Sequence, residues 1–201
     1  IKVIKQSNQG VSSARNTGLK NSSTKYCCFL DADDEWNDNY LTVISGLVKS
    51  YPKNAFYCTG YAFVDANNNV CNFINKKFSS YVGEVDSYIE SSTSGHTIIN
   101  SNLTVNTSFL LSHGGFPVGV SHGEDRITWF QLTLKNKIIF DFRICFYRHE
   151  SLNNSSSTWN PNNGSVFLGE ITLKKYDHLR GIDKLRIQEL SRYGRHAALR
   201  N

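Results

Sequence analysis

Hydrophobic and polar residues along this 201-residue chain change between a strand period of two and a helix period of 3.6. Runs of β-favouring residues predict strands at 1–5, 26–30, 55–65, 70–74, 97–105 and 137–147. Apolar positions three, four or seven apart predict helical segments at 11–20, 41–48, 107–112, 126–135 and 171–199. Strands that alternate with helices indicate an α/β fold with a mostly parallel, mixed sheet flanked by helices, Rossmann-like in arrangement.

Two polar segments interrupt this pattern. Residues 75–96 carry a weak pattern, with one short helical turn near 85–90, and predict a loop that could cover a site. Residues 152–165 are rich in Asn and Ser and have the low complexity of a linker. The chain is therefore expected to contain one domain at 1–157, followed by a linker and helical extension at 158–201.

Composition places the chain among ordinary globular proteins. A hydrophobic content of 39% suffices for a core, and no apolar run is long enough to span a bilayer. The sequence opens without a signal-peptide pattern. Its five cysteines are odd in number and none lies in a C-x-x-C spacing, so they are interpreted as reduced core residues. These features together predict a cytoplasmic location.

The net charge of +5 is small, and the basic residues gather in residues 171–200. We expect the basic face of this segment to be exposed to solvent in the first place. The second expectation is peripheral association with the anionic inner face of a membrane. Nucleic acid is not expected as a partner, because the interleaved aromatic residues and binding motifs are missing.

Carboxylates gather where the predicted strand at 26–30 ends. Asp31, Asp33 and Asp34 follow this apolar run directly, with Glu35 beyond them. Carboxylates this close repel one another unless a cation lies between them. A divalent cation with phosphate and a solvated acidic turn that caps the next helix both explain the run.

Other charged residues occupy the ends of predicted elements. Arg15 lies near the start of helix 11–20, where the helix dipole disfavours a cation, so we expect it to have an anionic partner such as Asp31 or a ligand phosphate. A structural ion pair is the equal alternative. Glu124 and Asp125 precede helix 126–135, where the dipole favours carboxylates.

The strand at 137–147 runs into Arg148 and His149. Ligands of open α/β sheets bind beyond the carboxyl ends of the strands. The acidic run after residue 30 and the basic pair after residue 147 both follow strands. These positions favour a real ligand site over a solvated acidic turn.

The order of motifs resembles a known family. Q-G-V-S-S-A-R-N-T-G-L and Y-C-C-F-L-D-A-D-D-E-W are followed by G-G-F-P-V-G-V-S-H-G-E-D and by F-Y-R-H-E-S. This ordered set resembles the family 2 glycosyltransferases of the GT-A fold over residues 1–157. A lone D-x-D would be a weak signal, whereas the whole set at these separations is specific.

The resemblance implies an inverting, metal-dependent enzyme. Such an enzyme transfers a sugar from a nucleotide-sugar donor, most often a UDP-sugar, to an acceptor hydroxyl, in the biosynthesis of cell-surface polysaccharide or glycoconjugate. The implied partners are the donor and a saccharide or lipid-linked saccharide acceptor, and the implied cofactor is Mg2+ or Mn2+. Carried over by motif, Arg15 would face the nucleotide, Asp31 would contact its ribose side and Asp33 would hold the metal on the diphosphate.

The remaining motif residues also receive roles from the resemblance. Asp125, with Glu124 beside it, would supply the general base. His149 and Arg148 would approach the diphosphate from the other side, and His149 and Asp31 are further candidate metal ligands. Asp34 would play a supporting part.

One departure and two alternatives accompany the resemblance. Family members carry two βα units before the strand at 1–5, so about 60 or more further residues are expected to precede it. The first alternative is an inactive nucleotide-sugar-binding remnant or partner subunit. The second is a haloacid-dehalogenase-like phosphotransferase with Asp31 as nucleophile and Asp33 as acid/base, which the following Asp34, Glu35 and Trp36 fit poorly.

Overall fold

A computed structural model of the chain describes residues 1–71, 82–85, 98–120, 123–133 and 136–149. Its strands form one seven-stranded sheet. They are β1 (Tyr26–Cys28), β2 (Asp34–Trp36), β3 (Phe56–Val64), β4 (Val70–Cys71), β5 (Val82–Val85), β6 (Leu103–Asn106) and β7 (Ile138–His149). Four α-helices and a 3-10 turn complete the described part, α1 (Val11–Lys20), α2 (Tyr40–Ser50), η1 (Asn100–Asn102), α4 (Thr107–Ser112) and α5 (Glu124–Thr133).

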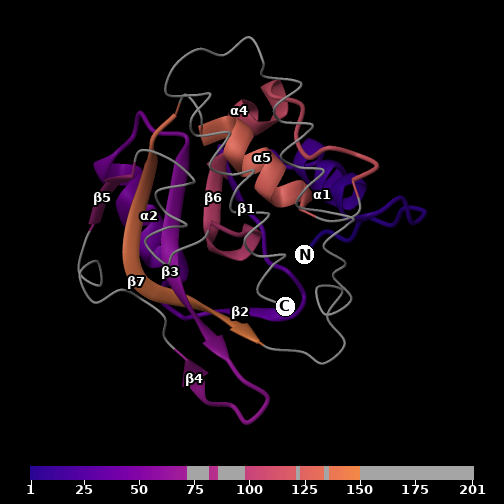
Figure 1. Ribbon diagram of the computed structural model, residues 1–201. Coiled ribbons are helices and arrows are strands. Elements are labelled where there is room, and N and C mark those ends of the chain that lie inside the picture. Colours follow the sequence, from indigo (N-terminus) through magenta and orange to yellow (C-terminus); the bar gives the residue numbers. More distant parts are fainter. Residues whose placement is uncertain (72–81, 86–97, 121–122, 134–135, 150–201) are drawn as a thin grey trace, which may run out of the picture.

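Helices cover both faces of the sheet (Figure 1). Alternate side chains of β3 and β7 point to opposite faces, as the two-residue period of a strand requires. Phe56, Cys58 and Phe140 belong to a core cluster that also holds Leu19 of α1, Leu110 of α4 and Trp129 of α5. Tyr57 and Ile139 face the other way and pack against Tyr40, Val43, Ile44 and Leu47 of α2. The α/β fold predicted from the sequence, a sheet flanked by helices, is confirmed.

The strand order is β1-β6-β3-β7-β2, with β4 added to β3 and β5 added to β7. Among the described strands only β3 and β7 pair in parallel, and the other pairs are antiparallel. The sheet is mixed, as expected, but its pairing is less parallel than the sequence pattern suggested, because β6 runs antiparallel between β1 and β3. Strands β1, β3 and β7 nevertheless share one direction, so their carboxyl ends meet at one edge.

A bulge changes the course of β7 halfway along. From Thr59 to Tyr61 strand β3 advances two residues, while β7 advances five, from Asp141 to Phe146. Gly60 lies opposite the bulge, where a Cβ atom would collide with the carbonyl oxygen of Phe142. Such bulges bend a strand and increase its local twist. Beyond it, β7 curls toward β2 (Figure 1).

Several local predictions need correction. Residues 1–5 are exposed and form no strand, because no described strand lies beside them to share hydrogen bonds. Strand β1 is an edge strand of half-buried residues rather than a fully buried one. The strand predicted at 97–105 begins only at Leu103, after η1. Residues 82–85, predicted as loop, pair with β7 as β5.

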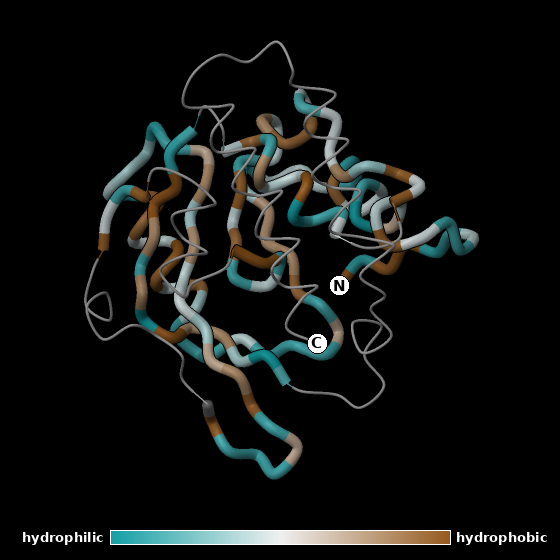
Figure 2. Tube along the Cα trace, viewed as in Figure 1, coloured by the Kyte–Doolittle hydropathy of each residue, from teal (hydrophilic) through white to brown (hydrophobic). Residues whose placement is uncertain are grey.

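The turn between β3 and β4 is drawn largely in hydrophilic colours, whereas hydrophobic residues follow the packed elements (Figure 2). No helix in the described ranges is long and apolar enough to cross a membrane. The predicted linker and basic helical extension at 158–201 lie outside the described residues. Of the helical turn predicted near 85–90, Val85 ends strand β5 and residues 86–90 lie outside the described residues.

Candidate active site

Arg15 of α1 joins two acidic motifs that lie far apart in the sequence. One guanidinium nitrogen, Nη2, donates to Asp31 Oδ1 at 2.7 Å, and the other, Nη1, donates to Glu124 Oε1 at 2.6 Å. The Arg15 side chain is only 12% exposed. Burial lowers the pKa of Arg15, but the two carboxylates outweigh it, so the pKa of this guanidinium is raised. The anionic partner predicted for Arg15 is therefore Asp31, and Glu124 is a second one.

The next residue, Asn16, holds the loop that leads to α5. Its Nδ2 donates to the carbonyl oxygen of Phe116 and its Oδ1 accepts from the Phe116 amide, both at 2.8 Å. Gly115 has φ +68° and passes so close to Asn16 that a Cβ atom would collide with the amide oxygen. The R-N pair on α1 thus fixes both the acidic run after β1 and the segment before Glu124.

The D-A-D-D run forms a four-residue turn. The amide of Asp34 donates to the carbonyl of Asp31 at 3.0 Å, which closes the turn, and Asp33 lies exposed at its middle. The hydroxyl of Ser101 in η1 accepts from the Asp31 amide at 3.1 Å and donates to Asp34 Oδ2. Asp34 then begins β2 rather than a helix cap, so the run is partly a turn and partly a strand.

Pairing of β2 with β7 brings the second charged cluster to the first. Asp34 lies directly opposite Arg148 in the ladder. His149 Nε2 lies 3.2 Å from Glu35 Oε2, a diagonal pair across the two strands. The Arg148 guanidinium lies over the Phe63 ring, 5.8 Å from its centroid. The pairing of β2 with β7 thus brings the acidic run and the Arg148–His149 pair together at one edge of the sheet.

Burial shifts the titration of two carboxylates in this cluster. The pKa of Asp34 is raised to about 6 because the group is buried and lies near Asp33 and Asp31, against the opposing effects of Ser101 and Arg148. The pKa of Asp125 is likewise raised, first by burial and then by Glu124. A carboxylate whose pKa moves toward neutrality is a better proton acceptor than an ordinary surface aspartate.

Glu124 and Asp125 differ in what they contact. Both lie in the first turn of α5, as predicted. The Glu124 carboxylate is buried and bound by Arg15. Asp125 Oδ1 accepts from the amide of Arg126 at 2.7 Å. Within the described ranges Asp125 forms no ion pair.

Comparison with known proteins identifies the family. A family model described as glycosyl transferase family 2 matches residues 1–109, more than half of the chain. The chain belongs to glycosyl transferase family 2. A Rickettsia bellii protein described as an uncharacterized glycosyltransferase is 30% identical over 138 residues, covering 68% of this chain and 19% of its own length. Glycosyltransferase GlyA of Streptococcus pneumoniae is 36% identical over 63 residues, 31% of this chain and 9% of its own length.

Solved structures share the fold of this family 2 chain. A crystal structure of S. aureus TarS residues 1–349 in complex with UDP-GlcNAc superposes with a TM-score of 0.68 at 15% sequence identity. The match covers 94% of this chain and 52% of that one. The GT-A fold expected from the motifs is thereby confirmed. The chain spans about a fifth of the length of the Rickettsia relatives that it matches.

Membership of the family implies a divalent cation. The carboxylate and imidazole side chains near the acidic turn are the residues that could coordinate it. No three His, Cys, Asp or Glu side chains converge on a point within the described part of the chain. Asp31 is bound by Arg15, and His149 lies against Glu35. Asp33 is exposed, and hard carboxylate oxygens suit Mg2+ or Mn2+. Such ions are commonly held by one or two carboxylates plus ligand phosphates, so the exposed Asp33 fits a site that a bound phosphate would complete.

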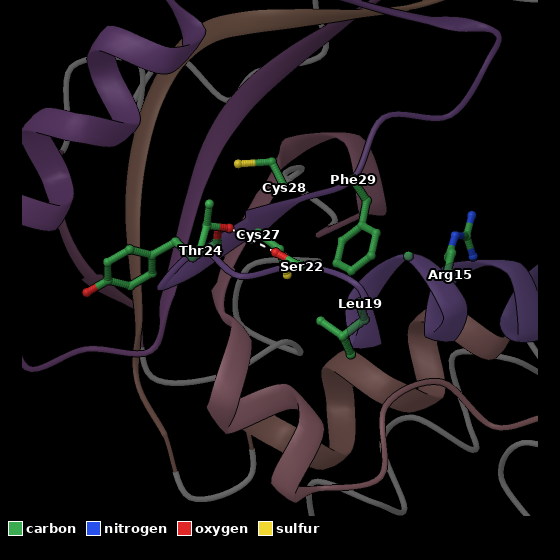
Figure 3. Close-up of a pocket in the computed structure, with 9 residues that line it drawn as sticks. Arg15, Leu19, Ser22, Thr24, Cys27, Cys28 and Phe29 are labelled. Carbon is green, nitrogen blue, oxygen red and sulfur yellow. Dashed lines mark hydrogen bonds between the residues drawn. The ribbon is translucent and has the colours of Figure 1, made fainter. Parts of the chain in front are cut away.

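The described cavity lies beside this cluster rather than at the carboxylates. It has a volume of about 380 Å³ and lies between α1 and β1. Figure 3 shows Leu19 and Phe29 between these elements, with Arg15 further along α1. Among the described residues of its lining Arg15 alone is charged, and the thiols of Cys27 and Cys28 are weak hydrogen-bond donors for a diphosphate. The lining of this cavity therefore offers few groups that could bind a diphosphate.

The sequence analysis gave no site role to Ser101, Glu35 or Asn16. Ser101 lies in the run N-S-N, which carries no pattern, so only the fold reveals its contacts. Glu35 became relevant because β2 places it near His149. Asn16 did stand in the quoted S-A-R-N motif, and its position directly after Arg15 was the available signal.

Proposed function

We propose that this chain is part of the catalytic domain of an inverting, metal-dependent glycosyltransferase. It transfers a sugar from a nucleotide-diphosphate sugar, a UDP-sugar in the first instance, to a hydroxyl of a saccharide or lipid-linked saccharide. The product belongs to a cell-surface polysaccharide or glycoconjugate. Family membership supports the general activity, and the bridge from Arg15 to Asp31 and Glu124 is the observation that carries the proposal.

That bridge unites the two halves of the reaction. The D-A-D-D turn presents Asp33 toward solvent at the carboxyl end of β1, where the donor diphosphate is proposed to bind. Arg15 holds Asp31 of this turn and Glu124 of α5 on a single guanidinium. The donor side and the proton-accepting side are thus fixed relative to each other before any substrate binds.

The proposed donor site uses Asp33 and Asp31 on one side and Arg148 and His149 on the other. Mg2+ or Mn2+ bound there would offset the charge that develops on the leaving diphosphate. Asp33, exposed at the middle of the turn, is the proposed principal protein ligand, with Asp31 and His149 as further candidates. Arg148 lies across from Asp34 and can attract the diphosphate oxygens.

Asp125 is the proposed general base. It takes the proton of the acceptor hydroxyl, whose oxygen attacks C1 of the donor sugar from the face opposite the diphosphate. The new glycosidic bond forms as the bond from C1 to the diphosphate oxygen breaks, so the configuration at C1 inverts. The raised pKa of Asp125 favours this proton transfer. Glu124, held by Arg15, orients the first turn of α5.

Transfer and hydrolysis of UDP-sugars by the complete protein, with and without Mn2+, test this proposal. Asp125→Asn and Asp33→Ala should each lower kcat by about a hundredfold or more, the usual effect of losing an acid–base group or a metal ligand. Asp65→Asn, in the turn after β3, is the matched control and should keep the wild-type rate. Wild-type rates in both site variants would refute the assignment, and donor binding without turnover would favour an inactive partner subunit.

The proposal extends to the setting of the enzyme. A cytoplasmic location with peripheral association of the basic segment 171–200 at the inner membrane face would bring the site to a lipid-linked acceptor. Nucleic acid has no part in it. The catalytic domain is taken as 1–157 and the extension as 158–201. Membership of the family disfavours the phosphotransferase alternative, in which Asp31 would be a nucleophile.

A further inference from the structure

The four-residue turn that carries Asp33 is held by one residue from another part of the chain. Ser101 lies in η1, 70 residues after Asp31, and is fully buried. Its hydroxyl accepts the Asp31 amide at 3.1 Å and donates to the Asp34 carboxylate. Its carbonyl oxygen accepts from Trp36 Nε1 at 2.7 Å. Ser101 therefore contacts both ends of the turn and the strand that follows.

Only a hydroxyl can make both side-chain contacts at this place. A serine hydroxyl offers one donor hydrogen and two acceptor lone pairs. The hydrogen is directed to Asp34 Oδ2, and a lone pair receives the Asp31 amide. Alanine offers neither group, and a thiol of similar size offers only weak equivalents. The two ends of the turn are thereby linked through a single oxygen atom.

The turn η1 does not need the Ser101 hydroxyl for its own shape. Asn102 Oδ1 accepts from the Ile99 amide at 2.9 Å, and Asn102 Nδ2 donates to the carbonyl of Thr59 in β3 at 2.9 Å. These contacts attach η1 to the centre of the sheet. Ser101 thus forms a connection from a rigid strand to the acidic turn.

We propose that Ser101 is a positioning residue that clips the two ends of the Asp31–Asp34 turn and so sets where the Asp33 carboxylate stands toward a nucleotide diphosphate and its divalent cation. Ser101 is fully buried and would be out of reach of a bound donor or acceptor, so it would act through the residues that it holds. This inference rests on the proposed donor site. Outer contacts that orient metal ligands commonly change metal affinity by 10- to 100-fold.

The test compares Ser101→Ala and Ser101→Cys with the wild-type protein. Ser108→Ala is the matched control, because Ser108 is exposed and its hydroxyl bonds only locally to Asn106 Oδ1 at 2.8 Å. Amide hydrogen exchange is measured without metal, and Mn2+ binding is measured by electron paramagnetic resonance in the presence of UDP. Both Ser101 variants should exchange the Asp31 and Asp34 amides at least about tenfold faster and bind Mn2+ about tenfold more weakly.

Amides of β3 should keep wild-type exchange in every variant, which shows that the fold is intact. Wild-type exchange at Asp31 and Asp34 in both Ser101 variants would overturn the inference. Where Mn2+ binding by the wild-type protein depends on Asp33, faster exchange with unchanged Mn2+ affinity would overturn it as well, because the hydroxyl would then be merely structural. If wild-type protein binds Mn2+ no better than Asp33→Ala, the proposed metal role fails, while faster exchange still supports Ser101 as the residue that holds the turn.

Discussion

Removal of the Arg15 side chain should destabilise the protein chiefly through Glu124 and only slightly through Asp31. The two carboxylates bond the same guanidinium at 2.6 and 2.7 Å, but their exposures differ. The Glu124 side chain is 10% exposed and that of Asp31 is 41% exposed. Loss of one partner from a buried pair costs about 3–5 kcal/mol, whereas exposed pairs contribute about 0.2–1 kcal/mol. Arg15→Met should therefore lower the free energy of unfolding by about 3–5 kcal/mol.

Double-mutant cycles separate the two contributions. Combining Arg15→Met with Glu124→Gln removes the unpaired buried charge, so we expect a coupling energy of about 2–3 kcal/mol. The cycle of Arg15→Met with Asp31→Asn should give less than about 1 kcal/mol. Urea unfolding at pH 7 and constant salt measures each free energy. The exposed pair Lys137–Glu84 serves as the reference for a surface interaction.

Coupling to Asp31 equal to or larger than coupling to Glu124 would refute the reasoning from burial. An Arg15→Met cost below about 1 kcal/mol would refute it too, because the bridge would then contribute no more than a surface ion pair. The cycles need only the folded protein and no substrate. They therefore test the geometry of the site independently of the proposed reaction.

Three further changes should have defined effects on unfolding. Asp34→Asn should stabilise the metal-free protein relative to wild type by about 1–2 kcal/mol more at pH 7 than at pH 4, as urea unfolding in EDTA would show. A constant difference would contradict the cause given for the Asp34 pKa. Gly60→Ala should lower the free energy of unfolding by about 2 kcal/mol or more, because its Cβ atom would collide with the β7 backbone. Gly46→Ala in α2, which has open space around it, should raise this free energy by about 0.5–1 kcal/mol. Equal shifts of the melting temperature in the two variants would be inconsistent with the bulge. Asn16→Ala should cost about 2–3 kcal/mol, because the amide and carbonyl of buried Phe116 lose their partner, and a loss below about 0.5 kcal/mol in urea would exclude that clamp.

The sign of the Asp34 effect follows from proton binding. The pKa in the folded protein is about 6, above the usual value near 4 of an unfolded chain. Between these two values the folded state binds more protons than the unfolded state, so stability falls as the pH rises. The full shift would correspond to about 3 kcal/mol, reduced here to about 1–2 kcal/mol because the side chain is partly exposed and screened by solvent. Asparagine does not titrate, so the Asp34→Asn variant does not lose stability in this way as the pH rises.

The strongly patterned elements were predictable from the sequence. Apolar periodicity located α1, α2, α4, β3 and β7, and the E-D pair was expected and found at the start of α5. Residues 1–5 show the limit of such patterns, since a β-favouring run becomes a strand only where a neighbour shares its hydrogen bonds. Strand β2 shows the converse, because Asp34, Glu35 and Trp36 have no apolar run and pair only because β7 extends beside them.

In the candidate site, too, some features could be predicted from the sequence and others could not. Its charged residues could be selected from motif order, and the rule of carboxyl ends favoured a site at their strand ends. The meeting of Asp34 with Arg148 depends on the unpredicted pairing of β2 with β7. The side chains that contact these charged residues could not be predicted from the sequence. The sequence left open whether Arg15 faces a phosphate or a carboxylate, and only packing of α5 against α1 brings Glu124 within reach. Ser101 lay in a segment without pattern, so its place under the acidic turn depends on η1 and β3.

The bulge in β7 has a consequence for which changes of length the chain can accept. Side chains alternate between the two faces of a strand, so one residue added or removed turns every following side chain over. Between the bulge and the site, β7 runs from Phe146 to His149 without further irregularity beside β3. A single insertion or deletion there would turn Arg148 away from Asp34, whereas lengthening the turn after Val64 would leave that pairing untouched. Among homologues, gaps should therefore accumulate in the β3–β4 turn and be absent from the last four residues of β7.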